Sequence, residues 1–434
     1  MSRTWTALSI IIAMAMMVSS VPAKAEVAPS DLTSGIGRFG SIICVDIDSD
    51  GRDEIVFGSY EGFVVSAEYL GGDYRVDWRS DQFGTRAWGL EAGQFDGDPA
   101  VELIIGDGDG NVRSIDGRTK EVEWESETLV RDADGLCLHD LDSDGKNELI
   151  VGTGFKTDQG WGQVYYFRPN SSEPYRELPP FDSRLREIAI ADLDDDGDED
   201  MLVCSGAALG DVPGEGYFRI FDPRTGELEF KSEDLGGCTE GMKVSDLDGD
   251  GSLEIVLSTG YRYREGYCYI YSFDGEGYSR IWRSENIGPK AYGLDVSDID
   301  GDDVLEIVVS NMAGRIFVYD GITRQREWTS GQLGRDILGL TIGDPDGDGE
   351  PEIVAAQGGY IGKGDYTSGY TTPHVYILDG RTKRMEAVFG EEDPLLPVLK
   401  ITLMISISIA IVLLALIVRV IVKARTLRKG MGAR

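Results

Sequence analysis

Histidine is scarce in this chain, which has two histidines, His139 and His374, among 434 residues. Neither lies beside a Ser or Cys in a nucleophile motif, so the sequence offers no Ser–His or Cys–His arrangement for nucleophilic catalysis. The 41 basic residues are also few against 77 acidic ones, which gives a net charge of −36. Because so negative a surface repels phosphate, nucleic acid is excluded as a partner.

Cysteine is limited to five residues, and no two of them form a Cys-x-x-Cys motif of the kind used in zinc or thiol redox sites. Cys44, Cys137, Cys204 and Cys268 lie inside apolar runs, which indicates small buried side chains. A disulfide between Cys238 and either Cys204 or Cys268 stays an alternative, because spacing alone does not decide the pairing.

Long apolar runs occur only near the two ends of the chain. Arg3 precedes the run from Ala7 to Val18, and the small residues of "VPAKA" follow it. This order of base, apolar run and small residues predicts a secretory signal peptide, residues 1–25, that is cleaved after Ala25. The run is too short for a membrane anchor.

The second apolar run, from Ile401 to Val418, has 18 residues without a charge. It is long enough to cross a bilayer and predicts a transmembrane helix over residues 398–422, after a short juxtamembrane linker at 391–397. The residues beyond it, 423–434, include bases and no acid, so this tail is expected inside the cell. The predicted location is the cell membrane, with a single span and the N-terminal domain extracellular.

One acidic motif is abundant in this chain. "VDIDSDGRDEIVFG" begins at Val45 and "SDLDGDGSLEIVLS" at Ser245, and five further copies follow the same pattern. The first positions of the seven acidic loops are residues 46, 94, 140, 192, 246, 298 and 344. A second mark, an aromatic residue with Ser two places later, precedes five of these positions by 16 residues, at Trp78, Trp124, Phe230, Trp282 and Trp328. Two marks at a fixed offset indicate a repeat protein.

Each repeat is predicted to form four strands. Apolar residues lead into the acidic loop, three apolar residues follow it, and an alternating run and a Gly- or Pro-bearing turn precede a last strand that ends on the aromatic mark. No helical periodicity occurs between the two ends. Four strands in about 50 residues, repeated seven times, predict an all-β fold, a seven-bladed β-propeller over residues 26–390.

The acidic loops have the spacing of a calcium site. Acids at positions one, three, five and nine, with the carbonyl group of position seven, can form an all-oxygen cage, and Gly at position six permits the sharp turn. Outside the two ends, 77 acids face 32 bases, and a cation would remove the repulsion. The predicted ligands are Asp46, Asp48, Asp50, Arg52, Glu54, Asp140, Asp142, Asp144, Lys146, Glu148, Asp192, Asp194, Asp196, Asp198, Asp200, Asp246, Asp248, Asp250, Ser252, Glu254, Asp298, Asp300, Asp302, Val304, Glu306, Asp344, Asp346, Asp348, Glu350 and Glu352.

Two alternatives for these loops fail. An EF-hand needs Glu at position twelve and flanking helices, whereas Phe57 and Val151 hold that position between predicted strands. A solvated charge run would not keep acids at the same four positions in six of seven loops. The second loop, 94–102, departs from the pattern: Gln94 replaces the first Asp, and Pro99 stands where a positive φ is needed. About six calcium ions are therefore expected, with the second loop empty or weakly occupied.

The loop "DLDGDG", followed by an acid and an apolar strand, resembles the FG-GAP/VCBS repeat family, which includes the seven-bladed propeller at the head of integrin alpha subunits. The resemblance covers roughly residues 38–390. It implies calcium at each loop, extracellular display and a role in adhesion or recognition. No further ectodomain follows the propeller, which departs from integrins and places integrin-type partnering in question.

The expected function is a calcium-stabilised, membrane-anchored module that recognises a protein or a glycan, with a neighbouring membrane protein among the possible partners. It is expected not to be an enzyme. A polysaccharide lyase or hydrolase on a calcium propeller, and a purely structural surface protein, are the alternatives. Long loops on the face opposite the acidic loops carry aromatic and Arg side chains suited to a ligand: Trp161, Tyr261, Arg262, Tyr263, Arg264, Tyr360, Tyr366 and Tyr370.

Overall fold

The computed structural model describes residues 42–59, 62–129, 132–154, 162–181, 184–206, 216–260, 265–334, 336–358 and 374–390. The predicted signal peptide, juxtamembrane linker, transmembrane helix and basic tail lie outside these ranges. Within them, no helix has the length and apolar character needed to cross a bilayer.

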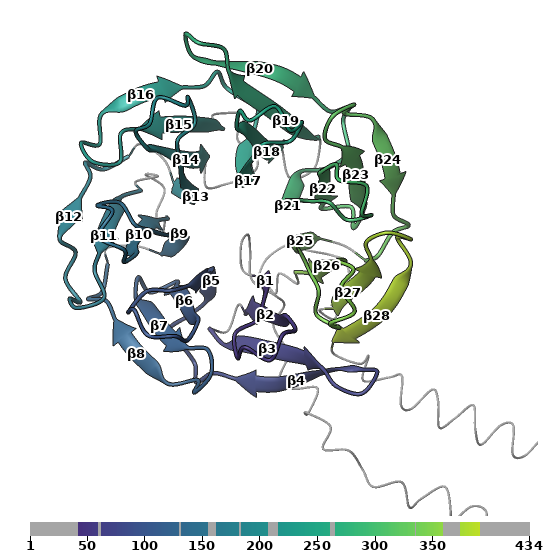
Figure 1. Ribbon diagram of the computed structural model, residues 1–434, viewed down its shortest axis with the longest axis horizontal. Coiled ribbons are helices and arrows are strands. Elements are labelled where there is room, and N and C mark those ends of the chain that lie inside the picture. The colour runs from purple at the N-terminus through teal and green to yellow at the C-terminus, as the bar shows by residue number, and fades with distance from the viewer. Residues whose placement is uncertain are drawn as a thin grey trace, which may run out of the picture. The chain divides into compact units, whose positions relative to one another are not determined.

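The described residues form seven antiparallel sheets of four strands each, arranged as the blades of a β-propeller (Figure 1). The first strand of every blade is innermost and the fourth is outermost, which confirms the predicted four-strand repeat.

The strands of the first four blades have the following bounds. Blade 1 contains β1 (Ile42–Val45), β2 (Glu54–Gly58), β3 (Val64–Tyr69) and β4 (Tyr74–Arg79); blade 2 contains β5 (Ala87–Gly93), β6 (Glu102–Asp107), β7 (Val112–Asp116) and β8 (Val122–Glu125). Blade 3 contains β9 (Ala133–His139), β10 (Glu148–Thr153), β11 (Val164–Phe167) and β12 (Arg176–Glu177); blade 4 contains β13 (Arg184–Ala191), β14 (Asp200–Gly206), β15 (Tyr217–Phe221) and β16 (Leu228–Lys231).

The remaining three blades repeat this order. Blade 5 contains β17 (Cys238–Ser245), β18 (Glu254–Gly260), β19 (Gly266–Phe273) and β20 (Tyr278–Arg283); blade 6 contains β21 (Ala291–Ser297), β22 (Glu306–Asn311), β23 (Ile316–Asp320) and β24 (Arg326–Thr329). Blade 7 contains β25 (Ile337–Gly343), β26 (Glu352–Gln357), β27 (His374–Asp379) and β28 (Met385–Gly390).

Seven large apolar clusters hold the ring together, one at each interface between neighbouring blades. The second strands are covered on both faces, which explains their continuous apolar runs, such as "EIVF" in β2. Between blades 4 and 5, for example, Leu202 and Phe218 pack with Ile255 and Tyr271. The rings of Phe218 and Tyr271 meet edge to face, with centroids 4.8 Å apart.

The Ser of the second repeat mark has a structural role. Ser284 Oγ accepts a hydrogen bond from the Cys268 backbone N–H at 2.9 Å and donates one to the Glu285 carbonyl at 2.9 Å. This ties the end of the fourth strand to the third strand of the same blade. The same acceptance from a third-strand N–H occurs at Ser80, Ser126, Ser232 and Ser330.

Within the described residues, the ring closes without exchange of strands, since the sheets of blades 1 and 7 each consist of their own four consecutive strands. Closure depends on packing of β1 against β25, where Ile42 joins Val354 in one apolar cluster. The backbones approach closely because β25 presents glycine there: a Cβ on Gly343 would lie 2.4 Å from the Cys44 Cβ.

All five cysteines lie in the described residues and none forms a disulfide. Cys204, Cys238 and Cys268 are buried, and Cys44 and Cys137 are half-buried. The expected burial is confirmed for Cys204 and Cys268, whereas Cys44 and Cys137 are only partly buried and pack against apolar clusters. Cys238 is not paired with Cys204 or Cys268.

Candidate metal centres

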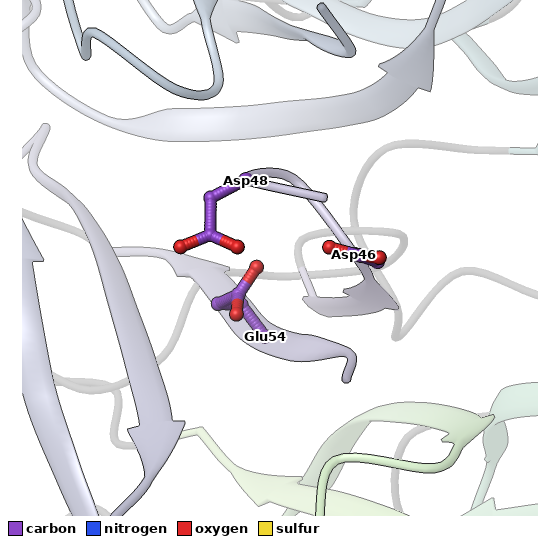
Figure 2. A group of neighbouring side chains, drawn as sticks. All are labelled: Asp46, Asp48 and Glu54. Atoms are coloured by element: carbon purple, nitrogen blue, oxygen red, sulfur yellow. The ribbon is translucent and has the colours of Figure 1, made fainter. Parts of the chain in front are cut away.

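The acidic loops connect the first and second strands of each blade, as the sequence predicts. In blade 1, Val45 pairs with Glu54 across the two strands, so position nine is the first residue of β2 and is held by the sheet. One carboxylate oxygen each from Asp46, Asp48 and Glu54 lies within 4.8 Å of the others (Figure 2). The same compact grouping unites Asp140, Asp142 and Glu148 in blade 3.

The loop backbone turns inward at two positions, of which the sequence analysis identified one. Position six is in the left-handed region, as expected, with φ of 93° at Gly51 and 67° at Asp303, the non-glycine member. Position four is left-handed as well: φ is 67° at Ser49 and 59° at Asp195. The signal was present in the sequence, because four of the seven loops have glycine at this position: Gly97, Gly249, Gly301 and Gly347.

These turns direct backbone N–H groups at the first carboxylate. Asp46 Oδ1 accepts from the Asp50 N–H and its Oδ2 from the Gly51 N–H, each at 3.0 Å. Asp50 Oδ1 in turn accepts from the Arg52 N–H at 3.0 Å. The loop is thus organised by its own acids, and the use of the position-seven carbonyl as a ligand stays a prediction.

The acid at position nine is the buried member of the set. Glu54 is 2% exposed, and its Oε2 accepts from the Ile47 N–H at 2.9 Å. Its Oε1 is buried without a hydrogen-bond partner. Burial raises the pKa of Glu54 to about 7, and burial likewise raises that of Glu306 to about 7.

The seventh loop lacks the donor that serves position nine elsewhere. Its position two is Pro345, which has no backbone N–H to donate. Glu352 is 2% exposed, and its Oε2 is buried without a hydrogen-bond partner. Burial, followed by the nearby charges of Asp346 and Glu386, raises the pKa of Glu352 to about 9.

The donor set fits calcium. Carboxylate oxygens are hydrogen-bond acceptors only, so a buried one without a donor needs a proton or a cation. Besides Glu54 and Glu352, the loops contain four more such oxygens: Glu102 Oε1, Asp246 Oδ1, Asp248 Oδ1 and Asp300 Oδ1. Because every predicted ligand atom is oxygen, the loops suit a hard cation such as Ca²⁺ rather than zinc or copper.

Basic side chains near the loops were missed by the sequence analysis. Arg168 Nη2 lies 2.7 Å from Asp142 Oδ2, and Arg324 Nη2 lies 3.6 Å from Asp248 Oδ2. Lys120, on the β7–β8 turn of blade 2, interacts with Asp77 and Glu54 of blade 1. These bases come from other strands or from the next blade, so the spacing of residues within a loop does not predict their contacts with the acids.

The two histidines lie on different blades, His139 at the end of β9 and His374 at the start of β27. His139 Nε2 lies 2.7 Å from Glu199 Oε1 and so links the third and fourth loops.

The candidate ligand residues of the opposite face all lie outside the described residues. Near that face, the first strands carry a buried network of ion pairs that the sequence analysis missed. Arg184 pairs with Asp134, and Glu240 pairs with Lys290 and, at 3.6 Å, with Arg186. In every pair the two residues come from different blades, so the ion pairs link neighbouring blades near their inner strands.

Comparison with known proteins agrees with this architecture. A family model of the FG-GAP-like repeat matches residues 140–203 and 246–309, which contain the third to sixth acidic loops. No curated protein matches the chain.

Among solved structures, Sqt1 of Saccharomyces cerevisiae is 11% identical, with a TM-score of 0.53, and the match covers 82% of this chain and 86% of that one. BBS1N, in a complex with ARL6DN, is 11% identical with a TM-score of 0.52, and the match covers 75% of this chain and 91% of that one. At these identities the similarity shows the fold alone.

Proposed function

Because the chain is a seven-bladed β-propeller built from FG-GAP-like repeats, we propose that it is a calcium-stabilised recognition or adhesion module, held outside the cell by a single membrane span. The observation that carries the calcium proposal is the set of buried carboxylate oxygens without donors, led by Glu54 and Glu352. A bound cation would satisfy these oxygens and offset the repulsion within each loop.

Thermal unfolding of the full chain, with calcium or with EDTA, tests this role. A ligand that binds the folded state alone stabilises it by about 2.7 kcal/mol when its concentration is 100 times its Kd. We expect a clear rise in melting temperature with calcium. An equal melting temperature in EDTA would overturn the proposal.

A matched pair of variants in the fourth loop localises the effect. Asp196→Asn removes a charge from position five, whereas Asp195→Asn removes one from position four, whose side chain is not a predicted ligand. Asn tolerates the left-handed backbone that Asp195 adopts. Calcium should stabilise Asp196→Asn less than the wild type and leave Asp195→Asn near the wild type.

The extracellular location and the anchor are proposals from the sequence. If they hold, protease added to intact cells removes the propeller and spares the basic tail, and the mature protein begins at Glu26. A purified protein that begins at Met1 would contradict the cleavage.

Recognition rather than catalysis is proposed because the described residues contain no histidine-based nucleophile arrangement. FG-GAP-like repeats also agree with a recognition module. Binding of the detergent-solubilised chain to glycan and surface-protein arrays in calcium is the test. Cleavage of a polysaccharide by the chain would instead support the lyase or hydrolase alternative.

A further inference from the structure

The second acidic loop departs from the repeat, yet the structure gathers acids around it. At position one, Gln94 Oε1 accepts from the Gly97 N–H at 3.2 Å, and its Nε2 donates to the Ala100 carbonyl. The amide thus occupies the place of the missing Asp and uses the position-seven carbonyl. The loop cannot form the same cage as the other six.

Acids from two other strands approach this loop. Asp96, Glu102 and Glu123 each offer one carboxylate oxygen within 4.8 Å of the others, and Asp98, Asp116 and Glu123 do the same. Glu123 lies on the outer strand β8, and Asp116 ends β7. Glu123 is therefore shared between the two groups and stands outside the nine-residue loop.

One member of this group, Glu102, has a buried oxygen without a hydrogen-bond partner. Glu102 is 0% exposed, and its Oε2 accepts from the Phe95 N–H at 2.6 Å. Its Oε1 is buried and has no hydrogen-bond partner. The same arrangement at Glu54 belongs to a loop that keeps the full motif.

No base within the described residues forms an ion pair with these five acids. In blade 3, by contrast, Arg168 pairs with Asp142 of its own loop. Lys120 interacts most strongly with Asp77 and Glu54 of blade 1. The turn of blade 3 that adjoins blade 2 contributes a carbonyl instead: Trp124 Nε1 donates to the Ser171 carbonyl at 2.9 Å. Among the described residues, Arg118 and Lys120 act on Asp116, and no base forms an ion pair with the other four carboxylates.

We propose that blade 2 holds a hard divalent cation such as Ca²⁺ at a site of its own, bound by Asp96, Glu102 and Glu123, with Asp98 and Asp116 on its second side. Glu123 of the outer strand takes over the charge that Gln94 cannot supply. This goes beyond the six loops of the full motif and replaces the expectation that the second loop is empty.

Counting bound calcium in the full chain at about 1 mM free calcium, near the range of extracellular sites, tests the proposal. The wild type is expected to bind seven ions. Glu123→Gln should bind six, or bind one ion at least tenfold more weakly. Glu121→Gln, the same charge change in the preceding turn and outside both groups, should retain all seven.

A count of six in the wild type, or equal binding in the wild type and Glu123→Gln, would overturn the proposal, as would an equal loss in Glu121→Gln. Asp98→Asn provides a second variant if Glu123→Gln does not unfold cooperatively in calcium. A wild type with one ion that Glu123→Gln abolishes would leave this site standing while the six-loop calcium proposal fails.

Discussion

Single residues set how strongly each loop needs a cation. Glu54 and Glu352 occupy the same repeat position and are equally buried. Glu54 has a backbone donor from Ile47, and Glu352 has none, because Pro345 stands in the place of that donor. Their pKa values of about 7 and about 9 differ accordingly, and so should the response of the two loops to pH.

The raised pKa of Glu352 predicts that, without calcium, the stability of the folded protein falls as the pH rises. The pKa of Glu352 is raised in the folded state from an ordinary 4.5 to about 9, so the folded protein binds the proton more tightly than the unfolded chain does. Its contribution to stability is present below pH 4.5 and is lost as the pH rises toward 9. In EDTA, the melting temperature should fall between pH 5 and 9.

Calcium should cancel this fall, because the ion replaces the proton on an ionised carboxylate. Glu352→Gln should make the fall in EDTA smaller, most of all at its alkaline end, because Glu54 and Glu306 still contribute near pH 7. Glu350→Gln, an exposed acid of the same loop, should leave the fall unchanged. A melting temperature in EDTA that rises over this range would contradict the assignment.

The Ser of the second mark is a further residue-scale determinant. Ser284→Ala removes one acceptor and one donor at a buried site, leaving the Cys268 N–H without its side-chain partner. We expect a loss of about 1–3 kcal/mol in unfolding free energy, measured by denaturant titration. Ser252→Ala, an exposed Ser in a loop, should change stability little; similar losses in both would argue against the role of Ser284.

At the scale of the element, the acidic loop is a strand connection whose conformation is set by two left-handed residues. The sequence analysis identified position six because glycine recurs there, and overlooked position four because Ser and Asp share it with glycine. The residue at position two fixes the loop to the core: in the third loop, Leu141 packs into the apolar cluster between blades 3 and 4. Loop and blade interface are therefore coupled.

Opposite substitutions in the third loop test this backbone requirement. Ser143, at φ 58°, replaced by Gly should raise stability by about 1 kcal/mol, because an L-residue is strained there. Gly145→Ala, at φ 86°, should lower it by about 1–2 kcal/mol. A Cβ on Gly145 meets no atom within 4 Å, so the loss reports the backbone alone.

Both variants are best compared by denaturant titration in saturating calcium. Shifts of the same sign for the two substitutions would refute the assignment of both positions to the left-handed region.

For the whole molecule, closure of the ring is the distinguishing feature. Six of the interfaces join blades that are consecutive in the chain, whereas blades 1 and 7 meet through packing. A backbone and side-chain link supports that contact: the Asp344 N–H donates to Asp53 Oδ2 at 3.0 Å, and the Asp53 N–H donates to the Asp344 carbonyl at 3.3 Å. Both residues belong to acidic loops, so cation binding should also support closure.

Asp53→Ala should therefore destabilise the ring at its closure. We expect a loss of about 1–3 kcal/mol and faster hydrogen exchange in β1 and β25. Asn147→Ala removes a 2.7 Å bond to the Gln94 carbonyl at the corresponding position of blade 3, where the chain itself joins the blades. Its effect on exchange should be smaller, and an equal effect would show that closure has no special dependence on Asp53.

The sequence by itself determined the features that depend on local spacing. These are the repeat, the four strands of a blade and the grouping of positions one, three and nine, because neighbours in a tight loop or hairpin meet wherever the chain lies. The sequence predicted that the acid at position nine is a ligand. It could not predict the burial and raised pKa of that acid, because both depend on how the blades pack.

Only the tertiary structure decided what comes from distant segments. Glu123 reaches the second loop from an outer strand, and Lys120 interacts with Asp77 and Glu54 of another blade. In the described part of the chain, the ring closes by packing of β1 against β25 and exchanges no strand. Such contacts join residues that no fixed spacing relates. They exist because packing around a closed ring places one blade's turns and strands beside the next blade's loops.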